Sequence, residues 1–133
     1  MAQPDSRSPT VFVIDDDADV RASIAGLLKS AGLRAETFES AEEFLSGERS
    51  DGPRCLVLDF TLSSTNGFEV ERELSDAGVQ IPIILLSAHT DLPTRARAMK
   101  SGVVAFLTKP FGDQDLLDAV QQALNRDRTM RQR

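Results

Sequence analysis

Thr10-Val11-Phe12-Val13-Ile14-Asp15-Asp16 is the stretch that decides the fold, because a nearly continuous apolar run leads directly into two acidic side chains. A run that is apolar at successive positions, rather than at alternate ones, is typical of a strand covered on both faces, as in parallel sheets. Ligands of open parallel sheets bind outside the carboxyl ends of the strands. Residues 10–14 are therefore predicted to form a buried parallel strand, with Asp15 and Asp16 at the edge where a site would form.

Three further apolar runs lead to polar side chains in the same way. They are 55–58 followed by Asp59, 83–86 followed by Ser87, and 103–107 followed closely by Lys109. If all four strands lie parallel in one sheet, their carboxyl ends share one edge. Three carboxylates, a hydroxyl and an ammonium would then gather there, which is a suitable set for a hard cation and a phosphoryl group.

The segments between these runs have the apolar spacing of amphipathic helices. Glycine residues end three of them, and Ser40 and Asp113 are predicted as N-caps. A further short strand is predicted at 34–38. Strands that alternate with helices in this way predict an α/β protein with a flavodoxin-like (βα)5 fold, a doubly wound parallel sheet with the strand order 2-1-3-4-5.

The length of 133 residues fits one domain. We expect residues 1–8 to be a disordered N-terminal segment, residues 9–126 to form the folded domain, and residues 127–133 to begin a linker or a C-terminal tail. Cys55 is the only cysteine and lies within a predicted strand, so a buried, unreactive thiol and a reducing compartment are expected. Met99 is expected in the core.

Charge and hydropathy limit the partners and the location. The formal net charge is −6 and the sequence pI is about 4.7, which argues against nucleic-acid binding by the folded domain, since phosphate contacts need a clustered basic face. The sequence has no apolar run near the roughly 20 residues of a membrane span, and residues 1–5 lack the layout of a secretory signal. We therefore expect a cytoplasmic protein without a membrane partner.

The acidic cluster needs a counter-charge. Two unit negative charges ~4 Å apart repel by about 4 kcal/mol at an effective dielectric constant of about 20. A divalent cation such as Mg²⁺ removes this repulsion and leaves Asp59 able to act as a nucleophile that forms an aspartyl-phosphate. Lys109 and Ser87 could then hold phosphoryl oxygens. The competing interpretation is structural, because an acidic residue after a strand often caps the next helix, as Asp16 or Asp17 could do here.

On these residues the chain resembles a receiver domain of a bacterial two-component response regulator, over residues 9 to about 126. The matching residues are Asp15-Asp16, Asp59 eight residues before Gly67, Ser87-Ala88 and Lys109-Pro110-Phe111. A finer resemblance, to receivers attached to LuxR-type helix-turn-helix transcription factors, rests on Leu92-Pro93, Ala98-Met99-Lys100-Ser101-Gly102 and Phe106.

The resemblance implies specific roles for these residues. Asp59 would accept phosphate from a sensor histidine kinase, and Ser87 and Lys109 would contact the phosphoryl group. The Lys109-Pro110 bond is usually cis in this family. Mg²⁺ would be held by the carboxylates of Asp16 and Asp59, by the backbone carbonyl of Thr61, and by Asp15 through water.

The resemblance also implies a conformational switch rather than an enzyme. Phe106 would turn inward when Ser87 moves toward the phosphate, and phosphorylation would promote homodimerisation through residues 92–111. DNA would be bound only by an output domain beyond this chain, and the whole regulator would control transcription. A stand-alone single-domain response regulator is the main alternative. An aspartate-nucleophile phosphatase is less well supported, because it expects a second aspartate at the position of Thr61.

Two residues depart from the family pattern in the loop after Asp59. Ser63 stands where proline is usual, and Thr65 stands where a bulky apolar residue, often methionine, is usual. Proline restricts the backbone, so its loss predicts a more mobile loop. His89, near the expected site, is most simply a solvated loop residue, with gating of an attacking water as the alternative.

Overall fold

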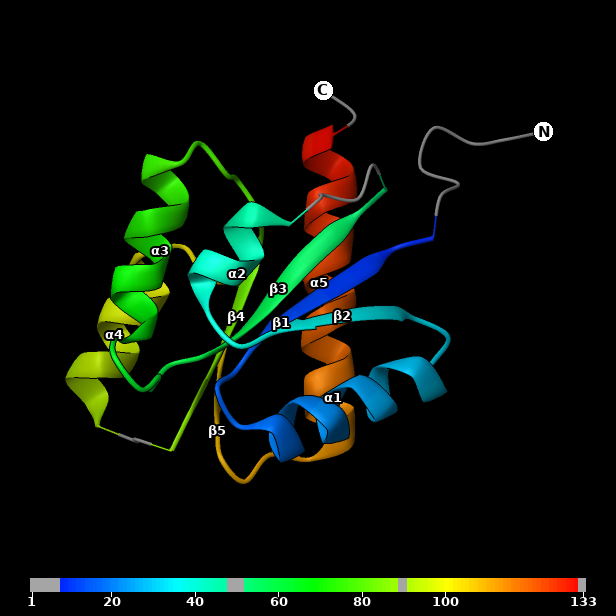
Figure 1. Ribbon diagram of the computed structural model, residues 1–133, viewed down its shortest axis with the longest axis horizontal. Helices are drawn as coiled ribbons and strands as arrows, with labels where there is room; N and C mark the ends of the chain where they lie inside the picture. The colour runs from blue at the N-terminus through cyan, green and yellow to red at the C-terminus, as the bar shows by residue number, and fades with distance from the viewer. Residues whose placement is uncertain (1–7, 48–51, 89–90, 132–133) are drawn as a thin grey trace.

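The computed structural model describes residues 8–47, 52–88 and 91–131, which form a parallel sheet with helices on both faces (Figure 1). The five strands lie in the order β2-β1-β3-β4-β5, as predicted. Their bounds are β1 Thr10–Ile14, β2 Arg34–Phe38, β3 Arg54–Asp59, β4 Ile83–Ser87 and β5 Ala105–Thr108. Residues 1–7 of the expected disordered segment, and His89, lie outside the described residues.

The helices divide between the two faces of the sheet. Helices α1 (Ala18–Ser30) and α5 (Asp113–Arg131) cover one face, and α2 (Ala41–Ser46), α3 (Gly67–Asp76) and α4 (Leu92–Lys100) cover the other (Figure 1). Successive strand side chains point to opposite faces. In β1, Val11 and Val13 therefore pack in one core cluster, and Phe12 and Ile14 pack in the other.

Capping interactions fix where the helices begin and end. Asp17 caps α1, because its carboxylate accepts hydrogen bonds from the N–H groups of Asp19 and Val20 at 2.9 and 3.3 Å. Ser40 caps α2 as predicted, with its hydroxyl accepting from the Glu43 N–H at 3.1 Å. The glycines predicted to end three helices all have positive φ, a conformation that suits glycine: Gly32 at 82°, Gly78 at 75° and Gly102 at 94°.

Other expectations need correction. Asp113 is the first residue of α5 rather than its cap, and the preceding Gly112 donates its N–H to the Asp115 carboxylate at 3.1 Å. Helix α5 continues to Arg131, so residues 127–131 of the expected linker or tail are helical. Within this part of the helix, the buried Asp127 carboxylate accepts a hydrogen bond from the Arg54 N–H at 2.9 Å.

The burial of Met99 and of Cys55 can also be compared with expectation. Met99 is 48% exposed on α4 and is not a core residue, whereas Cys55 is a free, buried cysteine as expected. Burial raises the pKa of the Cys55 thiol. None of the helices in the described residues is long and apolar enough to span a membrane.

Candidate functional site

Three carboxylates converge at the carboxyl edge of the sheet. Asp15 directly follows β1 and Asp59 ends β3, and these strands are neighbours with Ile14 paired to Leu58. One carboxylate oxygen from each of Asp15, Asp16 and Asp59 lies within 4.8 Å of the others. Asp15 and Asp59 are buried, whereas Asp16 is exposed. The strand order thus brings together the acidic residues that the sequence placed at one edge.

Only one of the two carboxylate oxygens of Asp15 has a hydrogen-bond partner in the described residues. Its Oδ1 accepts a hydrogen bond from the Asp17 N–H at 2.9 Å, whereas its buried Oδ2 has no hydrogen-bond partner in the described residues. Burial raises the pKa of Asp15, and the nearby charge of Asp59 raises it further. A buried carboxylate oxygen without a donor, facing two other carboxylates, is what a hard cation would satisfy. The residues present therefore fit a Mg²⁺ ion.

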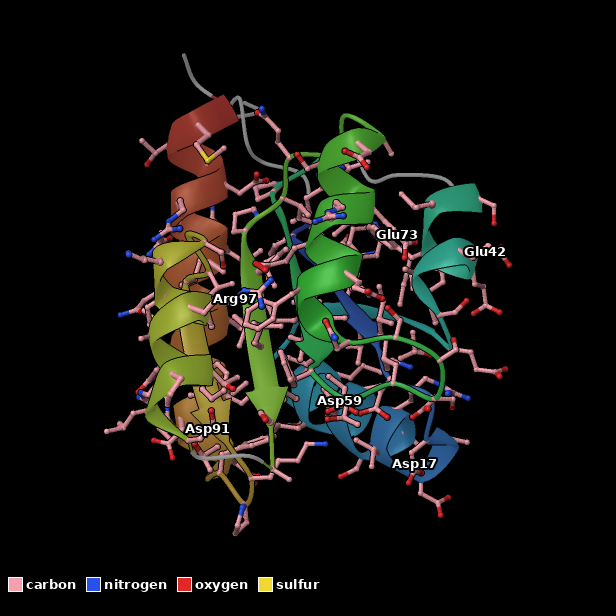
Figure 2. The ribbon with its side chains drawn as sticks, turned by 90° about the vertical axis from the view of Figure 1, so that its left-hand side faces the viewer. Asp17, Glu42, Asp59, Glu73, Asp91 and Arg97 are labelled. Carbon is pink, nitrogen blue, oxygen red and sulfur yellow. The ribbon has the colours of Figure 1, made fainter. Side chains whose placement is uncertain are left out.

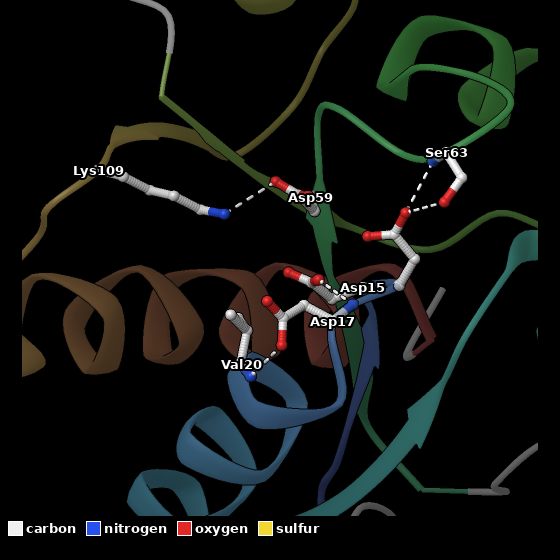
Figure 3. Close-up of polar contacts among 7 residues, drawn as sticks. Asp15, Asp17, Val20, Asp59, Ser63 and Lys109 are labelled. Carbon is white, nitrogen blue, oxygen red and sulfur yellow. Dashed lines mark hydrogen bonds and ion pairs between the residues drawn. The ribbon is translucent and has the colours of Figure 1, made fainter.

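Ser63 holds the Asp16 carboxylate by two hydrogen bonds. Its Oδ2 accepts a hydrogen bond from the Ser63 N–H at 2.7 Å and a second one from the Ser63 hydroxyl (Figure 3). The hydroxyl bond is the main reason that the pKa of Asp16 is lowered. Sequence reasoning noticed Ser63 only as a missing proline and did not predict this contact. No local sequence pattern identifies this contact, because the two residues lie 47 positions apart.

Lys109 supplies a positive charge to the cluster. Its Nζ lies 3.1 Å from Oδ1 of Asp59, to which it points in Figure 3. Its backbone N–H donates to the Ser87 carbonyl at 2.8 Å, which ties the segment after β5 to the end of β4. The Lys109-Pro110 bond is cis, as the resemblance implies. The exposed fractions of the two side chains are 31% for Lys109 and 10% for Asp59, so the pair is partly shielded from water.

The two predicted switch residues lie on neighbouring strands. Ser87 is buried at the end of β4, paired with Thr108 of β5. Phe106 is 4% exposed and packs in the core cluster beneath α4, with the Arg95 guanidinium 5.7 Å from the ring centroid. The aromatic ring is therefore inward in this structure.

The loop after β3 is closed by its own hydrogen bonds. The Leu62 N–H donates to the Thr65 carbonyl at 3.1 Å, and the Gly67 N–H donates to the Phe60 carbonyl at 2.8 Å. Thr61 lies in this loop and forms an isolated bridge with Asn66. The expectation that this loop is more mobile without proline remains a prediction.

A basic side chain that the sequence did not single out also contacts the site. The Arg21 guanidinium donates to the backbone carbonyl of Asp15 at 2.6 Å and so joins α1 to the end of β1. Its only sequence signal is its position near the start of a helix that follows two acidic residues.

Residues 11–121 match the family model described as the response regulator receiver domain. The chain belongs to this family. Nodulation protein W of Bradyrhizobium diazoefficiens is 45% identical over 127 residues, which cover 96% of this chain and 56% of that protein. Transcriptional regulatory protein TdiR of Thauera aromatica is 46% identical over 121 residues, which cover 91% of this chain and 53% of that protein. This receiver domain spans about half the length of these relatives.

Solved structures agree with the family assignment. Response regulator StyR matches with a TM-score of 0.85 and 44% identity, covering 95% of this chain and 64% of that one. The FixJ-N crystal structure matches with a TM-score of 0.80 and 34% identity, covering 90% of this chain and 95% of that one. The predictions of a flavodoxin-like fold and of a receiver domain of two-component response regulators are confirmed.

Proposed function

We propose that Asp59 is the phosphoacceptor of this receiver and takes its phosphoryl group from a sensor histidine kinase. The observation that carries the proposal is the site's arrangement of charge. Asp15, Asp16 and Asp59 lie within 4.8 Å of one another, and Lys109 lies 3.1 Å from Asp59. An oxygen nucleophile beside a positive side chain and a cation site is suited to phosphoryl transfer, which needs mainly positioning and charge stabilisation.

Each residue has a separate task in this proposal. Asp15, Asp16, Asp59 and the backbone carbonyl of Thr61 would hold Mg²⁺, and the orphaned Oδ2 of Asp15 supports this assignment. Mg²⁺, when bound, neutralises negative charge on the carboxylates and the phosphoryl oxygens. A carboxylate oxygen of Asp59 attacks phosphorus while the bond from phosphorus to the phosphohistidine nitrogen of the kinase breaks, so that the imidazole is the leaving group. Lys109 holds a phosphoryl oxygen by its charge, and the hydroxyl of Ser87 donates a hydrogen bond to another.

Phosphorylation of Asp59 is tested by intact-mass measurement after treatment with acetyl phosphate and Mg²⁺. We expect the wild type to gain the mass of one phosphoryl group, and we expect this gain to disappear in excess chelator because the carboxylates then repel the anionic donor. Asp59→Asn should gain nothing, whereas the control Asp113→Asn, on the first turn of α5, should behave as the wild type. Labelling of Asp59→Asn equal to that of the wild type would contradict the assignment.

We further propose that this receiver controls transcription through an output domain of the LuxR type, with phosphorylation favouring a homodimer. TdiR, which is about twice the length of the matched region, is described as a transcriptional regulatory protein. On α4, Leu92 is 77% exposed and Met99 is 48% exposed, so residues 92–111 present apolar side chains to solvent. Exposed apolar side chains near a switch residue such as Phe106 support an interface there.

A further inference from the structure

Ser63 places two hydrogen-bond donors on a single oxygen of Asp16. Both its backbone N–H, at 2.7 Å, and its hydroxyl donate to Oδ2. Ser63 lies in the loop between β3 and α3, whereas Asp16 lies between β1 and α1. The contact therefore joins two loops that both line the candidate cation site.

The loop that carries Ser63 is itself fixed. The Leu62 N–H bonds to the Thr65 carbonyl at 3.1 Å, and the Leu62 side chain is 9% exposed. On the other side of the loop, Asn66 caps α3 by accepting from the N–H groups of Phe68 and Glu69 at 3.0 and 3.1 Å. Ser63 thus presents its donors from a turn that is closed by hydrogen bonds on both sides.

Asp16 needs such support more than its neighbours do. It is exposed, whereas Asp15 and Asp59 are buried, and the negative charges of those two residues repel it. A side chain held by nothing would rotate toward water and away from the cluster. Both bonds from Ser63 fall on Oδ2, so Oδ1 can bind a cation while both bonds stay intact.

We propose that Ser63 is a positioning residue that holds the Asp16 carboxylate ready for Mg²⁺. The inference rests on the proposed cation site. Proline at this position has neither an N–H nor a hydroxyl, so it could not make either bond. In this chain, serine replaces the backbone restriction of proline with direct support of a metal ligand, which lowers the ordering cost of binding the ion.

The test is a Mg²⁺ titration of the unphosphorylated protein. Binding is monitored through the NMR chemical shifts of backbone amides at the carboxyl edge of the sheet. Ser63→Ala keeps the N–H bond and loses the hydroxyl bond. Removing the hydrogen-bond partner of a metal ligand typically lowers metal affinity by about 10- to 100-fold, and one of the two bonds remains here, so we expect Mg²⁺ affinity to fall by about three- to tenfold. Ser63→Thr, which keeps both donors, should restore wild-type affinity. Ser64→Ala, an exposed serine next along the same loop, should have no effect.

A second comparison isolates the route through Asp16. In an Asp16→Ala background, Ser63→Ala should cause no further loss of affinity, because the ligand that it positions is gone. Unchanged or tighter Mg²⁺ binding by Ser63→Ala, or an equal loss in the Asp16→Ala background, would overturn the role of Ser63 while leaving the cation site in place. Absence of Mg²⁺ binding by the wild type would instead overturn the cation site and the role of Ser63 with it.

Discussion

At the scale of single residues, the site is defined by unbalanced charge. Three carboxylates lie within 4.8 Å of one another, and the cation within ion-pair distance of them in the described residues is Lys109, at 3.1 Å from Asp59. The buried Oδ2 of Asp15 adds an acceptor without a donor. The sequence predicted which residue types meet, because each follows an apolar run. It did not predict Ser63 or Arg21 as contacts, because hydrogen bonds between distant loops leave no local pattern.

Removing the ammonium of Lys109 should destabilise the protein in a way that Mg²⁺ reverses. Lys109→Ala leaves the three carboxylates without their nearby positive charge, and the pair is only partly shielded, so we expect a loss of about 1–2 kcal/mol in chelator. A bound divalent cation supplies the missing charge. Urea unfolding, with and without Mg²⁺, should therefore show a larger stabilisation by the ion in the variant than in the wild type.

Lys100→Ala is the matched control for this experiment. Lys100 is an exposed lysine in the last turn of α4, away from the acidic cluster. It should unfold as the wild type does under both conditions. Equal Mg²⁺ stabilisation of Lys109→Ala and the wild type would show that the ammonium does not balance the charge of the cluster.

At the scale of elements, the strands were predicted more accurately than the helix ends. Continuous apolar runs identified β1, β3 and β4, but the run at 103–107 begins before β5 does. Val103 is buried in the core, and the Val104 N–H bonds to the Ile83 carbonyl at 2.7 Å, so burial starts before the regular ladder. The C-terminal part of α5 is tied to β3 by the hydrogen bond between Asp127 and Arg54, 73 residues apart, which no local pattern reveals.

Helices α3 and α4 are joined by polar contacts that no periodicity predicts. The Ser101 hydroxyl donates to the Glu71 carboxylate at 2.9 Å, and the Arg97 guanidinium lies 4.0 Å from the centroid of the Phe68 ring. Figure 2 shows Arg97 between the two helices. Burial raises the pKa of Glu71, although Ser101 and Arg97 both act to lower it. The ionised form of Glu71 is therefore less favourable in the folded protein than in the unfolded chain.

Glu71→Gln should stabilise the protein at neutral pH but not in acid. Glutamine can still accept the bond from Ser101, and it carries no charge to bury. Since the folded-state pKa of Glu71 is raised, the wild type loses stability as pH rises through that pKa, whereas well below the ordinary glutamate value of 4.5 the residue is neutral in both states. The gain should thus be present at pH ~7 and disappear on acidification below the ordinary range for glutamate.

Thermal unfolding of both proteins across this pH range measures the difference. Glu73→Gln is the matched control, because Glu73 is exposed on the same helix. Its free energy of unfolding should stay close to that of the wild type. A gain for Glu71→Gln that persists unchanged in acid would show that the charge of Glu71 is not its cause.

At the scale of the whole molecule, the candidate site and the proposed partner surface lie on neighbouring elements. Asp59 lies on β3, Ser87 ends the neighbouring β4, and Phe106 lies on β5 against α4. A change at the proposed phosphoacceptor could therefore reach α4 through two strands that are hydrogen-bonded side by side. The sequence predicted this order of elements, because the strand order follows from the βα alternation. Which apolar side chains stay exposed could not be predicted, as Met99 shows.

Phosphorylation should promote homodimerisation through residues 92–111. We expect phosphate on Asp59 to draw in the Ser87 hydroxyl and so to change the packing of α4 against Phe106, whose ring is already inward in this structure. Moving a two-state equilibrium from about 1% to about 99% needs about 5.5 kcal/mol, so a partial shift is expected.

Sedimentation velocity should show more dimer for the phosphorylated wild type, and little gain for Ser87→Ala. Leu92→Glu, which changes a 77% exposed side chain, should accept phosphate normally and remain monomeric. Met130→Glu, exposed but outside this segment, should dimerise as the wild type does. Equal dimerisation of Leu92→Glu and the wild type would place the interface elsewhere.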